Sequence, residues 1–188
     1  MPIPLSEAEV ESLSKELWIA FFPLQDPSAI VPMMAHIKHL YCFFNASPDG
    51  KTLIAQSTAE RWCTQTNLDG GSGSNSYYIY FKARELADVI LYAGLSGTAF
   101  EDYLHMHPME VLGCLGIALS LIAYMQTRVP YDTGRVLTAV RVRFVDLSPI
   151  HCYSFTDLKA NAVGRLVSIR GHVIRVSAAR PLILSGTV

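Results

Sequence analysis

One long alternating segment near the C-terminal end, residues 158–182, constrains the fold of this chain more than any other feature. Apolar and polar residues alternate through 166–170 (LVSIR) and again through 172–177 (HVIRVS), and Gly171 separates the two runs. Alternation with a period of two is typical of a half-buried β-strand, and a glycine inside such a strand is typical of a bulge or a tight bend. The pattern therefore predicts one long strand that curls across a small, closed β-barrel.

The same segment carries regularly spaced basic residues. Arg165, Arg170 and Arg175 recur every five residues, so an unbroken strand would place them on alternate faces. A bulge at Gly171 would change which of them share a face. A bent, basic strand of this kind is typical of the first strand of an oligonucleotide-binding (OB) barrel, which needs about five strands. We count at most three strands in residues 134–188, so the predicted barrel is incomplete and leaves an edge exposed.

The residues of this segment resemble the minichromosome maintenance (MCM) family of DNA helicases. The resemblance rests on 158–160 (LKA), on 164–171 (GRLVSIRG), and on Val173, Arg175, Ser177 and Pro181 at fixed offsets. In that family the pattern opens the OB-fold of the N-terminal domain. Looser matches to the recombination branch of the family occur earlier, at 17–22, 41–44, 79–86 (IYFKAREL) and 110–119 (EVLGCLGIAL).

The resemblance implies a DNA-binding and ring-assembly domain of an ATP-dependent helicase that acts in homologous recombination, DNA repair or replication. It implies a nuclear location and, as partners, single- or double-stranded DNA and other MCM subunits of a hexamer, among them minichromosome maintenance protein nine; no membrane partner is expected. Zinc and Mg-ATP are implied for the full-length family. The family's Cys-x-x-Cys pair and its G-x-x-x-x-G-K-[ST] motif are absent from this sequence. We therefore expect a fragment or truncated product without a cofactor, a metal site, catalytic residues or enzymatic activity.

Charge divides the chain at about the same place as the predicted fold. Residues 1–133 hold 7 lysines and arginines and 14 acidic residues, whereas residues 134–188 hold 8 and 2, for net charges of −7 and +6. A basic region beside an acidic one is typical of a module that binds polyanions. The alternative is that these arginines keep strand edges soluble. The predicted nucleic-acid contacts are Arg141, Arg143, Lys159, Arg165, Arg170, Arg175 and Arg180.

Helix signals dominate residues 1–133. Ser6 and Glu9 make a capping box that predicts a helix to about Phe22. Pro108 predicts the start of a long helix to about residue 126. Its apolar run, residues 111–125, is too short to span a bilayer, so we predict a buried helix.

The rest of the chain carries weaker indications of secondary structure. Residues 77–81 (YYIYF) predict a short aromatic strand, and residues 45–75, rich in glycine and serine, predict a flexible insertion. Residues 136–144 predict a strand with Arg141 and Arg143 on one face. The fold class is therefore α+β, with an N-terminal helical subdomain (1–133) followed by the first strands of an OB-fold barrel (134–188).

Two other functions remain open from the sequence. The acidic helical part is compatible with a protein–protein interaction or oligomerisation module that does not bind DNA. A stand-alone OB-fold would bind single strands by stacking bases on aromatic side chains. The two predicted strands after Gly164 contain no aromatic residue, so contacts through charge alone are favoured over stacking.

Overall fold

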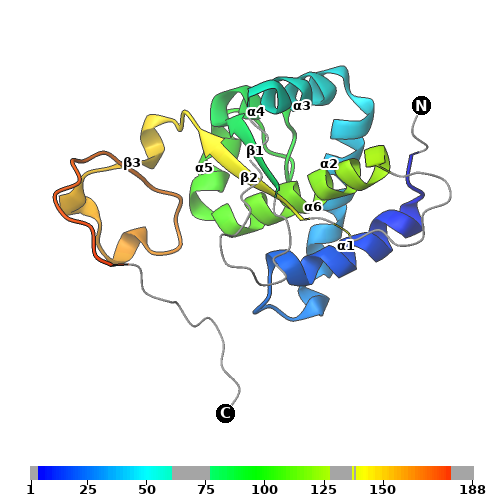
Figure 1. Cartoon of the computed structure of the whole chain (residues 1–188), viewed down its shortest axis with the longest axis horizontal. Helices are drawn as coiled ribbons and strands as arrows, with labels where there is room; N and C mark the ends of the chain where they lie inside the picture. Colours follow the sequence, from blue (N-terminus) through cyan, green and yellow to red (C-terminus); the bar gives the residue numbers. More distant parts are fainter. Residues whose placement is uncertain (1–3, 61–76, 128–136, 138, 179–188) are drawn as a thin grey trace, which may run out of the picture.

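The structure, a computed structural model, describes residues 4–60, 77–127, 137 and 139–178 (Figure 1). Helices dominate these residues and the strands form two small sheets, so the predicted α+β class is confirmed. The helices of four residues or more are α1 (Glu7–Phe21), α2 (Ile30–Ala46), α3 (Pro48–Glu60), α4 (Ala83–Val89), α5 (Thr98–Met106) and α6 (Pro108–Thr127). The strands are β1 (Tyr77–Lys82), β2 (Val140–Val145), β3 (Cys152–Tyr153) and β4 (Ser168–Ile169). Short 3-10 turns are η1 (Pro27–Ala29), η2 (Pro149–His151), η3 (Phe155–Asp157) and η4 (Ala160–Ala162).

The first helix begins at the predicted capping box. The Ser6 hydroxyl accepts a hydrogen bond from the backbone N–H of Glu9 at 3.3 Å, and a Glu9 carboxylate oxygen accepts one from the backbone N–H of Ser6 at 2.8 Å. Two of the donors that a helix start leaves open are thereby satisfied. Helix α1 ends at Phe21, just before Pro23, as predicted.

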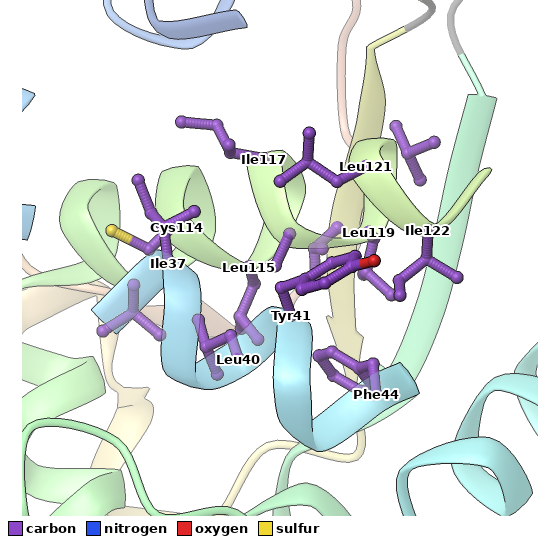
Figure 2. Close-up of a cluster of buried hydrophobic side chains, with 14 of the residues drawn as sticks. Ile37, Leu40, Tyr41, Phe44, Cys114, Leu115, Ile117, Leu119, Leu121 and Ile122 are labelled. Atoms are coloured by element: carbon purple, nitrogen blue, oxygen red, sulfur yellow. The ribbon is translucent and has the colours of Figure 1, made fainter. Parts of the chain in front are cut away.

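Helix α6 forms the centre of the core. Its apolar side chains meet those of α2, which crosses beside it, and Ile37, Leu40 and Leu115 are fully buried there (Figure 2). Pro108–Gln126 is the one helical segment among the described residues with the length and apolar composition of a membrane span, but 72% of that window is buried inside the chain. The prediction of a buried core helix is confirmed.

Two glycines allow α1 to lie close against α6. The ring of Phe22 occupies the space that a side chain at Gly113 would need, and the ring of Phe21 does the same at Gly116. The C-terminal end of α1 therefore packs directly on the α6 backbone, which places the Phe21 ring beside β2.

Strands β1 and β2 pair in parallel next to α6, and the pairing aligns Tyr78 with Arg141 and Tyr80 with Arg143. The buried face of this pair carries Ile79, Phe81, Val140 and Val142. The predicted strand at 77–81 is confirmed. The strand predicted at 136–144 is observed from Val140 to Val145, and positions 136 and 138 lie outside the described residues.

Residues 146–178 form a small C-terminal lobe beside α5, at one end of the helical body (Figure 1). Strands β3 and β4 pair in parallel there over two residues each. The backbone of Leu166 joins the lobe to α5, since its N–H donates to the carbonyl of His105 at 3.0 Å.

Two predictions about these elements are wrong. Residues 48–60 form helix α3 instead of part of a flexible insertion, because Pro48 and Asp49 suit a first helical turn; residues 61–75 lie outside the described residues. The long strand predicted through residues 166–177 is reduced to Ser168–Ile169, and residues 171–178 are exposed and without regular structure. A strand without neighbouring strands gains no ladder of hydrogen bonds, and the described residues form no closed barrel.

Candidate nucleic-acid interface

Strand β2 presents two arginines on one exposed face. Arg141 and Arg143 alternate with the buried Val140 and Val142, so both guanidinium groups leave the sheet on the side away from the core. The prediction that these two arginines share a face is confirmed.

An aromatic ring supports each of the two arginines. The guanidinium carbon of Arg143 lies 4.2 Å from the centre of the Tyr78 ring, and that of Arg141 lies 5.9 Å from the centre of the Phe21 ring. Both distances fall within the range of cation–π contacts. The rings therefore limit the freedom of both guanidinium groups without using their N–H donors.

The parallel register places a second pair of aromatic residues on this face. Tyr78 and Tyr80 alternate with the buried Ile79 and Phe81, so both tyrosines point to the same side as the arginines. We call Tyr78, Tyr80, Arg141 and Arg143 the Tyr–Arg ladder. It brings together two segments that lie about 60 residues apart in the sequence.

A groove runs beside the ladder. It encloses about 350 Å³ and is lined by Phe21, Tyr78, Met109, Leu112, Gly113, Arg141, Val142 and Arg143. Its apolar side comes from α1 and α6 and its charge from β2. A second hollow of about 200 Å³ lies at the other end of the ladder and includes Tyr80 and Val145 in its wall.

The arginines of the ladder have no acidic partner within the described part of the chain. The ion pairs found there join Lys15 and Lys38 to α1 glutamates and Lys82 to Glu85. Unpaired guanidinium groups are the donors that phosphate oxygens fit best. The charge on this face therefore stays available to an anion.

The other predicted contacts lie on the C-terminal lobe. Lys159, Arg170 and Arg175 are exposed and Arg165 is half-buried, while Arg180 lies outside the described residues. No described contact joins any of them to the arginines of β2. The structure thus brings together only Arg141 and Arg143 of the predicted set.

The tyrosines of the ladder and Phe21 were missed as site residues. From the sequence, residues 77–81 indicate only an aromatic strand, and Phe21 falls in the helix predicted to run to about Phe22. The signal that points to them is the matching alternation of 78–80 (YIY) and 141–143 (RVR). Two strands with this pattern place their polar ends on the same side when they pair.

A cluster of histidines joins the C-terminal lobe to α5. The carbonyl of Leu166 accepts hydrogen bonds from Nδ1 of His105 at 2.9 Å and from Nδ1 of His151 at 3.4 Å. The Tyr153 hydroxyl donates to Nε2 of His105 at 3.2 Å. Nε2 of His151 is buried with no partner among the described residues, and burial lowers the pKa of this imidazole.

Groups of three or more metal-ligating side chains do not occur in the described ranges. Cys42, Cys114 and Cys152 are free thiols there, and burial raises the pKa of the Cys114 thiol to about 12.

Comparison with protein-family models finds no match for the chain. Comparison with curated proteins also finds no match. The MCM resemblance therefore rests on the sequence motifs quoted above.

Proposed function

We propose that this chain is the N-terminal DNA-binding and ring-assembly domain of an MCM-type DNA helicase, most similar to minichromosome maintenance protein eight. Its work would be in homologous recombination, DNA repair or replication in the nucleus, with DNA and other MCM subunits, such as minichromosome maintenance protein nine, as partners. The observation that carries the proposal is the basic C-terminal third, in which Arg170 and Arg175 are exposed within the segment that resembles the family.

Charge supports the DNA-binding part of the proposal. Residues 134–188 carry a net charge of +6, and exposed arginines displace the counterions that surround nucleic-acid phosphates. Such contacts give affinity without sequence preference, as a collar that encircles DNA requires.

The exposed apolar residues of the C-terminal lobe support the OB-fold part. Val173, Ile174 and Val176 are 81%, 97% and 79% exposed, in the segment with the alternating pattern. Apolar side chains of a folded domain are normally covered. We infer that these residues enter the barrel when further strands pair with residues 164–178.

The zinc and Mg-ATP of the full-length family do not fit this chain. Neither a Cys-x-x-Cys pair nor a G-x-x-x-x-G-K-[ST] motif occurs in its sequence, and the described residues offer no donor set for a metal. The proposed role of this chain is therefore argued from DNA binding, without a step at zinc or ATP.

A salt titration of DNA binding tests the proposal. Fluorescence anisotropy would compare the chain with the Arg165→Ala/Arg170→Ala/Arg175→Ala variant on single-stranded and duplex DNA. We expect affinity to fall steeply with salt. On single strands, the slope of log K against log salt should be shallower by about 2 in the variant, at ~0.7 per lost phosphate contact.

A matched control removes three basic residues from the helical body. Lys15, Lys51 and Arg84 are exposed there, and their triple alanine variant should bind DNA with the slope of the unchanged chain. DNA binding that is insensitive to salt, or no binding by a chain shown to be folded by circular dichroism, would contradict the proposal.

The alternative of a protein–protein interaction or oligomerisation module without DNA binding stays a prediction. Helix α6 packs inside the chain, so such a module would use other surfaces of the helical part.

A further inference from the structure

We propose that the Tyr–Arg ladder is a platform for single-stranded DNA, on which Tyr78 and Tyr80 stack bases while Arg141 and Arg143 hold phosphates. This inference rests on the proposed DNA-binding function and deepens it in two ways. It names single strands as the preferred ligand, and it places stacking contacts on the helical body, outside the C-terminal lobe.

The spacing of the tyrosines fits a strand whose bases are separated. Residues two apart on a strand lie about 6.6 Å from each other, whereas nucleotides in one strand of a duplex are spaced by roughly 3.4 Å. Two rings at the wider spacing accept the faces of successive bases only when those bases are unstacked from each other. Paired and stacked bases of a duplex do not offer these faces.

The arginines are arranged to reach the backbone of the same strand. In the parallel register the backbone of Arg141 lies opposite Tyr78 and that of Arg143 lies opposite Tyr80. The Arg143 guanidinium covers one face of the Tyr78 ring, so a base would stack on the other face of that ring. Because Phe21 and Tyr78 already restrict the two guanidinium groups, less side-chain entropy is lost when they bind phosphate.

The groove beside the ladder supplies a wall for the base on Tyr78. Its volume of about 350 Å³ lies in the range of small-ligand sites, and Met109 and Leu112 of α6 add apolar surface to the ring of Phe21. A second hollow of about 200 Å³ includes Tyr80 in its wall.

An acidic peptide is the competing ligand for two unpaired arginines. It has carboxylates for the guanidinium groups but no flat rings for the two tyrosines. The paired arrangement of rings and charges therefore favours an oligonucleotide.

The test measures binding of the whole chain to a labelled oligothymidylate of roughly 20 nucleotides, which spans the usual single-strand site sizes. The Tyr78→Ala/Tyr80→Ala variant should bind at least about fivefold more weakly, with an unchanged salt slope. The Tyr78→Phe/Tyr80→Phe variant keeps both rings and should bind like the unchanged chain. For the Arg141→Gln/Arg143→Gln variant, the slope of log K against log salt should be shallower by about 1.4 than for the unchanged chain.

A duplex of the same length separates stacking from charge. On the duplex, the Tyr78→Ala/Tyr80→Ala variant should bind with the affinity of the unchanged chain. The Arg141→Gln/Arg143→Gln variant should still show weaker binding to the duplex. Circular dichroism checks that each variant folds. If the alanine variant does not fold, the unchanged chain decides the stacking role through its relative affinity for the two ligands. Tighter binding to the oligothymidylate than to the duplex supports stacking, and equal or weaker binding excludes it.

Failure of this inference and failure of the proposed function give different results. If the chain binds DNA but the ladder variants bind as tightly and with the same salt slope, the platform is excluded and the DNA-binding proposal survives. Binding by neither the chain nor any variant contradicts the DNA-binding proposal itself. Equal competition by a polyglutamate peptide of matched charge, or equal weakening by the phenylalanine variant, would overturn the stacking role.

Discussion

Single residues decide where β2 begins and therefore where its arginines lie. The Ser120 hydroxyl donates to the carbonyl of Gly116 at 2.7 Å and accepts from the backbone N–H of Val140 at 2.8 Å. Ser120 and Val140 are each 1% exposed, so water does not replace either partner. This one hydroxyl thus ties the first residue of β2 to α6.

Ser120→Ala is expected to lower the free energy of unfolding by about 1–3 kcal/mol, because the N–H of Val140 is left buried without an acceptor. Urea unfolding followed by circular dichroism measures the loss. Ser14→Ala is the matched control. The Ser14 hydroxyl is also buried, but it only donates to the carbonyl of Val10, which the helix already uses. An equal cost for the two changes would contradict the bridging role of Ser120.

The same contact shows what a sequence cannot reveal at this scale. Ser120 falls inside an apolar helical run and indicates nothing about β2, because its partner lies 20 residues further along the chain. The Tyr–Arg ladder has the same origin: YIY and RVR are each visible in the sequence, but their pairing depends on a long-range register. Local alternation predicted the shared face of Arg141 and Arg143 and missed the rings beside them.

At the scale of elements, local signals predicted well and pairing signals predicted poorly. The capping box of α1 and the proline at the start of α6 act within one helical turn, so the sequence contains their whole cause. The alternating segment after Gly164 has strong strand character. In the structure it forms only β4, which pairs with β3 over two residues.

The close approach of α1 and β2 to α6 depends on Gly116. A methyl group there would overlap the ring of Phe21 and lie 3.0 Å from the carbonyl oxygen of Val140. Gly116→Ala should stabilise the folded chain by about 1 kcal/mol through the higher helix propensity of alanine. It should destabilise the folded chain by ~1–3 kcal/mol through overpacking against Phe21 and Val140. We expect a net loss of stability of up to about 2 kcal/mol in urea unfolding.

A double-mutant cycle separates this overlap from other effects of the glycine. Phe21→Leu shortens the side chain that meets position 116, so Gly116→Ala should cost less in a chain that already carries Phe21→Leu than in the unchanged chain. Strict additivity of the two changes would show that the ring does not press on the helix. Stabilisation by Gly116→Ala alone would contradict the packing described for α1 and α6.

At the scale of the whole molecule, two histidines connect the C-terminal lobe to the helical body. His151 is fully buried in the lobe and His105 is 6% exposed on α5, with ring centres 5.3 Å apart. The groups that face the His151 ring are the Leu166 carbonyl, His105 and, from α5, the carboxylates of Glu101 and Asp102. Burial is the largest influence and outweighs these carboxylates, so the pKa of His151 is lowered.

A lowered pKa in the folded chain makes stability depend on pH in one direction. Below about pH 6.5, the usual pKa of histidine, the unfolded chain takes up a proton that folded His151 takes up only at lower pH. The contribution of His151 is therefore complete above about pH 6.5 and is lost as the pH falls toward its folded pKa. The loss for one proton is at most about 1.4 kcal/mol per pH unit.

His151→Gln tests this connection between lobe and body. We expect the variant to be less stable near neutral pH, since it loses a bond to Leu166, but its stability should fall less steeply between about pH 6.5 and pH 5. Urea unfolding at several pH values measures how the free energy of unfolding changes with pH in the unchanged chain and in the variant. His39→Gln replaces an exposed imidazole of α2. It is the control for the effect on pH-dependent stability of replacing a histidine that is not buried. If His151→Gln leaves the slope as steep as in the unchanged chain, a group other than His151 makes the stability of this molecule depend on pH.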